Sequence, residues 1–180
     1  MKNILIVGCG LIGSSILRAV SQKRLFKNIF VLEKSKKNIS VLKKLKLKCK
    51  IISSLKDISN SFDLIIFCTP MSQYSNVILK INKFVTNKTI VTDVGSTKEQ
   101  SFKNVKKILK KNTTWIPSHP ITGSEVSGPK FGNKDLFKNK WCVLIKENKV
   151  DKSSLFKLRK FWQKIGSKVI FMSSKQHDII

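Results

Sequence analysis

Residues 2–13 read KNILIVGCGLIG, and this stretch decides how the rest of the chain is interpreted. Its first half, from Lys2 to Val7, is a short apolar run without a polar face, as expected of a strand covered on both sides in a parallel sheet. Its second half has glycines at positions 8, 10 and 13, and apolar residues at helical spacing follow. The stretch therefore predicts a strand, a tight glycine turn and the start of a helix.

Each glycine has its own role in such a turn. Gly8 permits the tight turn, Gly10 lets a pyrophosphate approach the backbone, and Gly13 lets helix and strand pack closely. The helix N-terminus at Leu11 and Ile12 supplies free N–H groups and a partial positive charge for phosphates. The spacing predicts a dinucleotide-binding loop, and the alternative is a glycine-rich turn in another kind of α/β protein.

An acidic residue stands where the ribose of a bound dinucleotide is expected. Glu33 lies 20 residues after Gly13 and follows a second predicted strand, Asn28 to Leu32. A carboxylate there accepts hydrogen bonds from the adenosine ribose hydroxyls and repels a 2′-phosphate, so NAD is the predicted cofactor. Lysines at positions 34, 36 and 37 follow at once, which keeps NADP as the alternative.

Apolar runs and helical stripes alternate along the remaining chain. Further strands are predicted at 47–51, 64–68, 89–92, 114–116, 141–145 and 169–172, and further helices at 41–45, 71–85, 97–109 and 155–165. The run from Thr97 to Gln100 reads as a capping box at the start of one helix. The alternation predicts one α/β domain, a Rossmann-type doubly wound, mostly parallel sheet with helices on both faces. Residues 118–138 have no periodicity and are predicted to form a functional loop.

Composition limits the classes of function. With 180 residues and 41% hydrophobic content, the chain can bury a core, and no apolar run is long enough for a membrane span or a signal peptide. The sequence therefore predicts a cytoplasmic protein without a membrane partner. The formal net charge is +26, yet 33 of the 36 basic residues are scattered lysines, which favours a solvated surface over a nucleic-acid-binding face. Four separated cysteines and two histidines predict packed thiols and no metal site.

Polar clusters follow the later predicted strands, where ligands bind in open α/β sheets. Thr69 and Pro70 end the fourth strand and Asp93 ends the fifth, and these three residues complete the predicted cofactor-binding set. Ser96 is expected either to cap the next helix, to contact substrate, or to do both.

His119 directly follows the sixth predicted strand and lies in no apolar stripe. A neutral imidazole at this edge can take the proton from an alcohol while the hydride leaves for a nicotinamide. The alternative is a hydrogen-bonded structural histidine.

Three motifs together resemble the prephenate/arogenate dehydrogenase family: Gly8-x-Gly-Leu-Ile-Gly-x-Ser15, Asp93-x-Gly-Ser-x-Lys98 and His119-Pro-x-x-Gly-x-Glu-x-Ser-Gly128. The run from Asp135 to Leu144 is similar to the cyclohexadienyl dehydrogenase branch, and His177-Asp178 resembles the pair that opens the next helix of the family.

This resemblance implies an oxidative decarboxylation of prephenate and/or arogenate in tyrosine biosynthesis. Hydride would pass from the ring carbon bearing the 4-hydroxyl to NAD(P). The resemblance implies that His119 accepts the hydroxyl proton and that Ser96 lies beside that hydroxyl and the nicotinamide. It further implies that Glu125 orders the pocket and that Lys98 aids an anionic substrate.

The resemblance also sets the predicted domain boundaries. Residues 1–175 are expected to form the dinucleotide-binding domain, and residues 176–180 the start of a helical domain that is otherwise absent. In the family that domain forms the homodimer and supplies an arginine for the substrate carboxylate, and no arginine here matches it. The prediction is an NAD(P)-dependent dehydrogenase; the alternative is an NAD-binding remnant or regulatory module without turnover.

Overall fold

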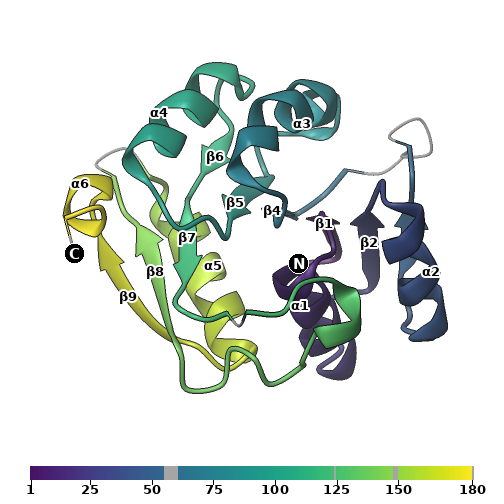
Figure 1. The fold of residues 1–180 in the computed structure, drawn as a ribbon. Helices are drawn as coiled ribbons and strands as arrows, with labels where there is room; N and C mark the ends of the chain where they lie inside the picture. The colour runs from purple at the N-terminus through teal and green to yellow at the C-terminus, as the bar shows by residue number, and fades with distance from the viewer. Residues whose placement is uncertain (55–60, 124, 148–149, 180) are drawn as a thin grey trace.

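The computed structural model describes residues 1–54, 61–123, 125–147 and 150–179, in which strands and helices alternate (Figure 1). The main sheet contains β1 (Asn3–Val7), β2 (Asn28–Leu32), β3 (Lys50–Ile52), β4 (Leu64–Phe67), β5 (Ile90–Asp93) and β6 (Thr114–Trp115). The α-helices are α1 (Leu11–Gln22), α2 (Lys36–Lys44), α3 (Tyr74–Ile81), α4 (Glu99–Ile108), α5 (Lys152–Lys164) and α6 (Ser174–His177). Short 3-10 turns are η2 (Met71–Gln73), η3 (Asn82–Phe84) and η4 (Pro129–Phe131).

The six strands of the main sheet are all parallel and run in the order β3-β2-β1-β4-β5-β6. This order is that of a Rossmann-type doubly wound sheet, so the predicted fold class is confirmed. Val7 pairs with Phe67 and Phe67 pairs with Asp93, so β1, β4 and β5 end side by side. The glycine loop and the polar cluster after β5 therefore leave the sheet at the same edge.

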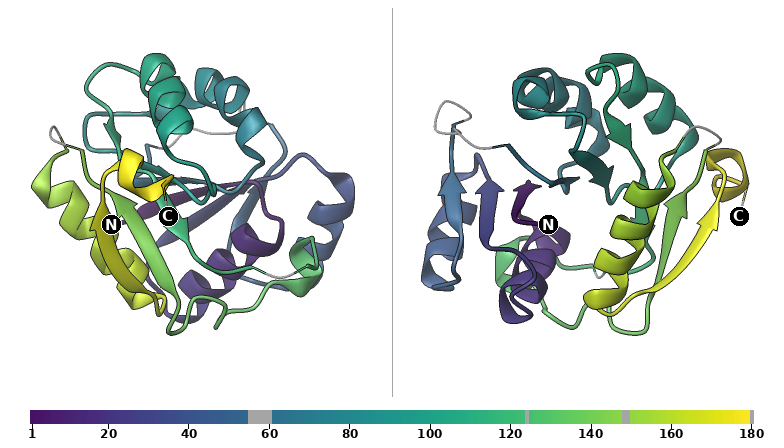
Figure 2. Two further views of the ribbon diagram at one scale, coloured as in Figure 1. Left: turned by 60° about the vertical axis from the view of Figure 1, so that its left-hand side comes forward. Right: turned by 180° about the vertical axis from the view of Figure 1, so that it is seen from behind.

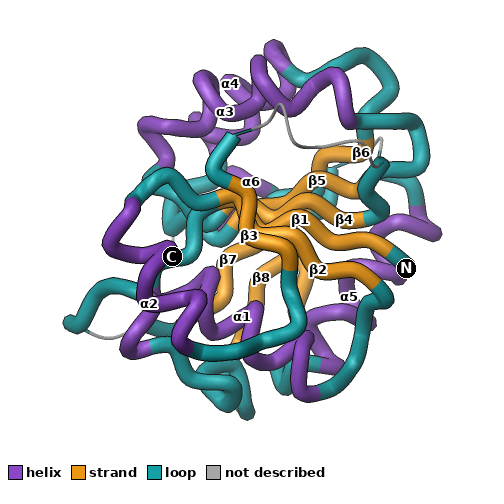
Figure 3. Tube along the Cα trace, turned by 90° about the vertical axis from the view of Figure 1, so that its right-hand side faces the viewer, coloured by secondary structure: helices purple, strands orange, loops and turns teal. Residues whose placement is uncertain are grey.

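Helices cover both faces of this sheet, as Figure 3 shows from the side. Ile4 and Ile6 of β1 face the cluster that contains α1 and α5, whereas Leu5 and Val7 face the cluster that contains α3 and α4. Alternation along one strand fills both layers because successive side chains point to opposite faces.

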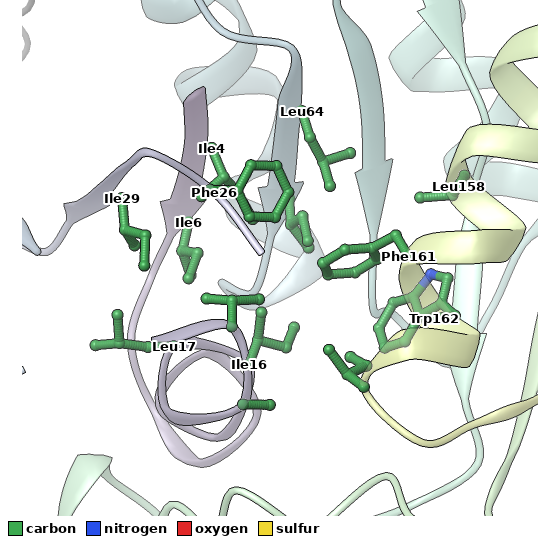
Figure 4. Packing of buried hydrophobic residues seen from close by; sticks show 14 of the residues in the cluster. Ile4, Ile6, Ile16, Leu17, Phe26, Ile29, Leu64, Leu158, Phe161 and Trp162 are labelled. Carbon is green, nitrogen blue, oxygen red and sulfur yellow. The ribbon is translucent and has the colours of Figure 1, made fainter. Parts of the chain in front are cut away.

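Aromatic side chains close the layer between α1 and α5 (Figure 4). The rings of Phe26 and Phe161 meet edge to face with centroids 6.1 Å apart, and Phe161 meets Trp162 in the same way at 5.4 Å. All three are buried, so α5 is fixed against the first βαβ unit by apolar packing.

A second sheet lies beside the first (Figure 2). It has three strands, β7 (Ser118–Pro120), β8 (Trp141–Ile145) and β9 (Lys168–Met172), with β7 antiparallel and β9 parallel to β8. The prediction of an aperiodic loop over 118–138 is therefore wrong at β7 and η4. Three residues that follow one proline and end with another carry no readable period, and β7 exists only because it pairs with β8.

Two helix predictions also need correction. The expected helix over 71–85 is divided into η2, α3 and η3. The predicted capping box at Thr97 is wrong. Helix α4 begins at Glu99, its N-cap residue is Lys98, and the Lys98 side chain makes no capping hydrogen bond. The Asp178 carboxylate, from the far end of the chain, accepts hydrogen bonds from the N–H groups of Lys98 and Glu99 instead.

All four cysteines are free thiols, two of them buried and two partly buried. Within the described residues, no helix combines the length and the apolar character needed to cross a membrane. Nor does this part of the chain contain a group of three or more His, Cys, Asp or Glu side chains placed so that they could hold a metal ion.

Candidate functional site

The glycine loop has the geometry of a phosphate cradle. Gly8 adopts φ +82°, and a Cβ on Gly13 would lie 2.2 Å from the Gly8 carbonyl oxygen, so both positions exclude side chains. Gly10 lies directly before α1, and among the described residues nothing beyond its chain neighbours lies within 4 Å of the place where its Cβ would be. The space over Gly10 and the first N–H groups of α1, at Leu11 and Ile12, can therefore admit a pyrophosphate.

Glu33 sits against this loop and is buried. Its carboxylate accepts hydrogen bonds from the backbone N–H of Cys9 at 2.9 Å, of Lys34 at 2.8 Å and of Ser35 at 2.9 Å. The side-chain amide of Asn38 is a fourth donor at 3.3 Å. The carboxylate thus shapes the glycine loop itself, and a ribose hydroxyl could replace the longest of these bonds, the one from Asn38.

Thr69 and Pro70 follow β4 at the same edge. The Thr69 methyl lies so close to Gly8 that a Cβ on that glycine would meet it at 2.6 Å. The Thr69 hydroxyl is buried and has no hydrogen-bond partner among the described residues, so it is a donor available beside the loop. Pro70 is exposed and precedes η2.

A buried ion pair ends β5. The Lys98 ammonium donates to both carboxylate oxygens of Asp93, at 3.0 and 2.8 Å, and both side chains are completely buried. Asp93 also accepts hydrogen bonds from the Tyr74 hydroxyl and from the backbone N–H of Gly95 and Ser118, each at 3.1 Å. This network makes Asp93 the junction between the main sheet and β7, and Lys98 faces inward rather than toward solvent.

His119 lies on β7, directly after the Ser118 that donates to Asp93, and is half-buried. Burial first, and then the positive charge of Lys98 and the neighbouring His177, lower the pKa of His119 to about 4, while Asp93 and Asp178 act weakly in the opposite direction. The imidazole is therefore neutral at pH 7 and has an unprotonated nitrogen.

A second histidine contacts His119 from α6. Nδ1 of His119 lies 2.9 Å from Nε2 of His177, and Nδ1 of His177 lies 2.7 Å from a carboxylate oxygen of Asp178. Three side chains thus form a hydrogen-bonded chain that ends at the N-terminus of α4.

The structure brings Asp93, Lys98 and His119 together but leaves two predicted residues apart from them. Ser96 and Glu125 are both exposed, and neither joins the hydrogen-bond network of His119 in the described residues. Ser96 is not the N-cap of α4 either.

The segment that carries Glu125 is docked on α1. The Ser15 hydroxyl accepts a hydrogen bond from the Asn133 N–H at 3.0 Å, and the Arg18 side chain donates to the Pro129 carbonyl at 3.1 Å. Ser15 therefore fixes the segment after His119 against the glycine-loop helix, a role that its place in the sequence motif does not reveal.

Sequence reasoning missed Tyr74, Ser118 and the contact of His177 with His119. Tyr74 is hidden as one member of an apolar helical stripe, and Ser118 as a small residue before a histidine. The pair His177-Asp178 is visible in the sequence, but only the fold shows that it faces His119.

The sheet order, the open glycine loop and the acid at the end of β2 define a Rossmann-type dinucleotide-binding domain. The family described as prephenate dehydrogenase, nucleotide-binding domain, matches residues 16–171. The chain belongs to this family, as its motifs predict.

Similar proteins agree with this assignment. The chain is 28% identical to cyclohexadienyl dehydrogenase of Zymomonas mobilis over 177 residues, covering 98% of this chain and 60% of that protein. It is 27% identical to prephenate dehydrogenase of Bacillus subtilis, covering 97% of this chain and 47% of that protein. The chain therefore spans about half to three-fifths of the length of these relatives.

Solved structures show the same fold. Prephenate dehydrogenase of Aquifex aeolicus, in complex with hydroxyphenyl propionate and NAD+, superposes with a TM-score of 0.90 at 27% identity, over 99% of this chain and 62% of that one. Arogenate dehydrogenase of Synechocystis has a TM-score of 0.85 at 22% identity, over 98% of this chain and 62% of that one, and shows the likeness of fold alone.

Proposed function

We propose that this chain binds NAD over the glycine loop and forms part of a dehydrogenase that oxidatively decarboxylates prephenate, arogenate or both in the synthesis of tyrosine. The observation that carries the proposal is a neutral imidazole, His119, which follows the Ser118 bound to Asp93 at the end of β5, the sheet edge where the open glycine loop also lies. Family membership and the NAD+ bound to the Aquifex aeolicus relative support it. NADP remains the alternative cofactor.

The residues present fit such a cofactor. Gly10 leaves space for a pyrophosphate, the N–H groups at Leu11 and Ile12 would donate to it, and Glu33 would accept from the ribose. Thr69, whose buried hydroxyl has no hydrogen-bond partner in the part of the chain that the structure describes, is the proposed donor beside the loop. When bound, the cofactor supplies the hydride acceptor.

His119 is the proposed proton acceptor. Because its pKa is about 4, one ring nitrogen is free to bind the ring hydroxyl at neutral pH. That hydroxyl becomes strongly acidic as hydride leaves its carbon, so even a weakly basic imidazole can take the proton.

The other residues receive more indirect roles. Ser96 and Glu125 are exposed and are proposed to contact substrate or nicotinamide from the loops after β5 and β7. Lys98 is buried on Asp93, so we assign it an electrostatic effect on His119 rather than a contact with the substrate.

We further propose that residues 1–175 are the cofactor domain and that residues 176–180 begin the helical, homodimer-forming domain implied by the family resemblance; Ile180 lies outside the described residues. Turnover is assigned to the whole protein, because the chain spans only part of its relatives. We place this protein in the cytoplasm, acting on a small molecule.

Two glycines provide a direct test of cofactor binding. In the described part of the chain, nothing beyond the chain neighbours lies within 4 Å of a prospective Cβ on Gly10 or on Gly123, so Gly10→Ala and Gly123→Ala should both fold normally. Only Gly10→Ala should weaken NAD binding, because its methyl group occupies the place of the pyrophosphate. Calorimetry with NAD should show at least a tenfold loss for Gly10→Ala alone. Equal affinities in both variants would contradict the proposed site.

His119→Asn tests the chemistry in an active assembly. NAD affinity should be kept, and kcat should fall by roughly 10²–10⁴-fold, the range for a lost general base. Unchanged turnover would leave His119 a structural residue.

A further inference from the structure

His119 reaches the second histidine through only one of its two ring nitrogens. Its Nδ1 faces Nε2 of His177 at 2.9 Å, and the two rings are tilted by 59° with centroids 5.1 Å apart. This is the geometry of a hydrogen bond in the ring planes rather than of stacked rings. One of the two nitrogens must therefore carry the shared proton.

The Asp178 carboxylate decides which of these two nitrogens carries the proton. Its carboxylate accepts from the N–H of Lys98 at 2.9 Å, from the N–H of Glu99 at 2.8 Å, and lies 2.7 Å from Nδ1 of His177. Partial burial raises the pKa of Asp178, but the hydrogen bonds from Glu99, His177 and Lys98 together hold it below its usual value. An ionised carboxylate only accepts hydrogen bonds, so Nδ1 of His177 must be the donor.

The remaining protons follow in order. When the proton on Nδ1 is the only one on the His177 ring, Nε2 of that ring is unprotonated. That nitrogen can only accept, so Nδ1 of His119 must donate to it. Since His119 is neutral at pH 7, its other nitrogen, Nε2, is left without a proton.

We propose that Asp178 and His177 are positioning residues that hold His119 in the Nδ1–H tautomer and keep its Nε2 ready to accept a proton. The inference rests on the proposed function for the identity of the proton donor, a substrate hydroxyl. When that proton arrives at Nε2, the ring becomes an imidazolium that keeps its Nδ1–H bond to His177, so no other proton has to move. The charged groups around this ring are Lys98, Asp93 and Asp178.

The same carboxylate also orders the other half of the site. By binding the N–H groups that open α4, Asp178 ties the segment after β5 to α6, and the favourable end of the helix dipole helps to keep it ionised. Lys98, which belongs to this segment, is thereby held next to Asp93. The tautomer of His119 and the position of Lys98 thus both depend on the Asp178 side chain.

The test is nuclear magnetic resonance of the ¹⁵N-labelled 180-residue chain at pH 7, which distinguishes a protonated from an unprotonated ring nitrogen. We expect a protonated Nδ1 and an unprotonated Nε2 in His119. His177→Ala should abolish this preference, and His177→Gln, whose carbonyl oxygen can accept the same hydrogen bond, should restore much of it. Lys175→Ala, an exposed change on the same helix, is the control and should leave the spectrum of His119 as in the wild type.

A proton on Nε2 of His119 in the wild type would overturn the inference, and so would an unchanged tautomer in His177→Ala. If His177→Ala does not fold, Asp178→Asn provides the same readout, since it removes the charge that orients His177. NAD titration of the same samples keeps the two proposals separate. If the wild-type chain does not bind NAD, the proposed function is contradicted. The positioning role of His177 and Asp178 is decided separately, by the tautomer of His119 alone.

Discussion

Lys98→Met should be among the most destabilising single changes in this chain. The variant removes the ammonium from a pair in which both side chains are fully buried and leaves the Asp93 carboxylate without its counter-charge. Removing one partner of a buried ion pair costs about 3–5 kcal/mol. Tyr74, Gly95 and Ser118 still donate to Asp93, so we expect the lower end of this range, about 3 kcal/mol.

Urea unfolding followed by circular dichroism measures this loss. With an m value of about 2 kcal/mol/M, the midpoint should fall by about 1.5 M at unchanged m. Lys103→Met is the matched control, because Lys103 pairs with Glu99 on the same helix but with 60% and 46% of the two side chains exposed, and should cost no more than about 0.5 kcal/mol. Adding Asp93→Asn to Lys98→Met should recover part of the loss, since no buried charge then stays unpaired. Equal losses from the two lysine variants would refute the reasoning.

Three further predictions concern pH, packing and cofactor choice. The pKa of His119 falls from about 6.5 in the unfolded chain to about 4 in the folded chain. The contribution of His119 to the free energy of unfolding should therefore be fully present above pH 6.5 and be lost between pH 6.5 and 4; because solvent screens a half-exposed ring, the loss should stay well below the roughly 3 kcal/mol of the unscreened shift. His119→Gln should lack this part of the slope in urea titrations. Gly132→Ala would place a Cβ 2.2 Å from the Ser14 hydroxyl and should cost about 1–3 kcal/mol in thermal or urea unfolding, whereas Gly123→Ala should be neutral. Glu33→Gln should weaken NAD binding by about 1–3 kcal/mol and relax discrimination against NADP, and calorimetry that finds the wild type preferring NADP would contradict the assignment.

Local features of the sequence determined most of the fold. The apolar runs at β1 and β4 are short and continuous, as both-sided burial requires, and the helical stripes have the period of 3.6 residues. The glycine turn and the acid at position 33 are also local signals, because each depends on backbone geometry within one βαβ unit.

Only the tertiary structure decided how the polar residues meet. The family resemblance implies that Lys98 aids an anionic substrate, yet its side chain is completely buried and pairs with Asp93, five residues earlier in the chain. The start of α4 reads as a capping box, yet its cap is Asp178, 80 residues away. A hydrogen bond across such a separation depends on where two elements come to rest, and no periodicity in the sequence encodes that position.

The same reason explains the candidate site. His119 was recognisable as a residue after a strand, whereas β7 exists only through pairing with β8, and His177 reaches the ring from 58 residues further along the chain. The sequence by itself determined which chemical groups are available and at which edge of the sheet they gather. The packing of α6 against α4 and β8 decided which nitrogen of His119 faces His177, because only fixed distances between distant segments can select one hydrogen-bond partner over another.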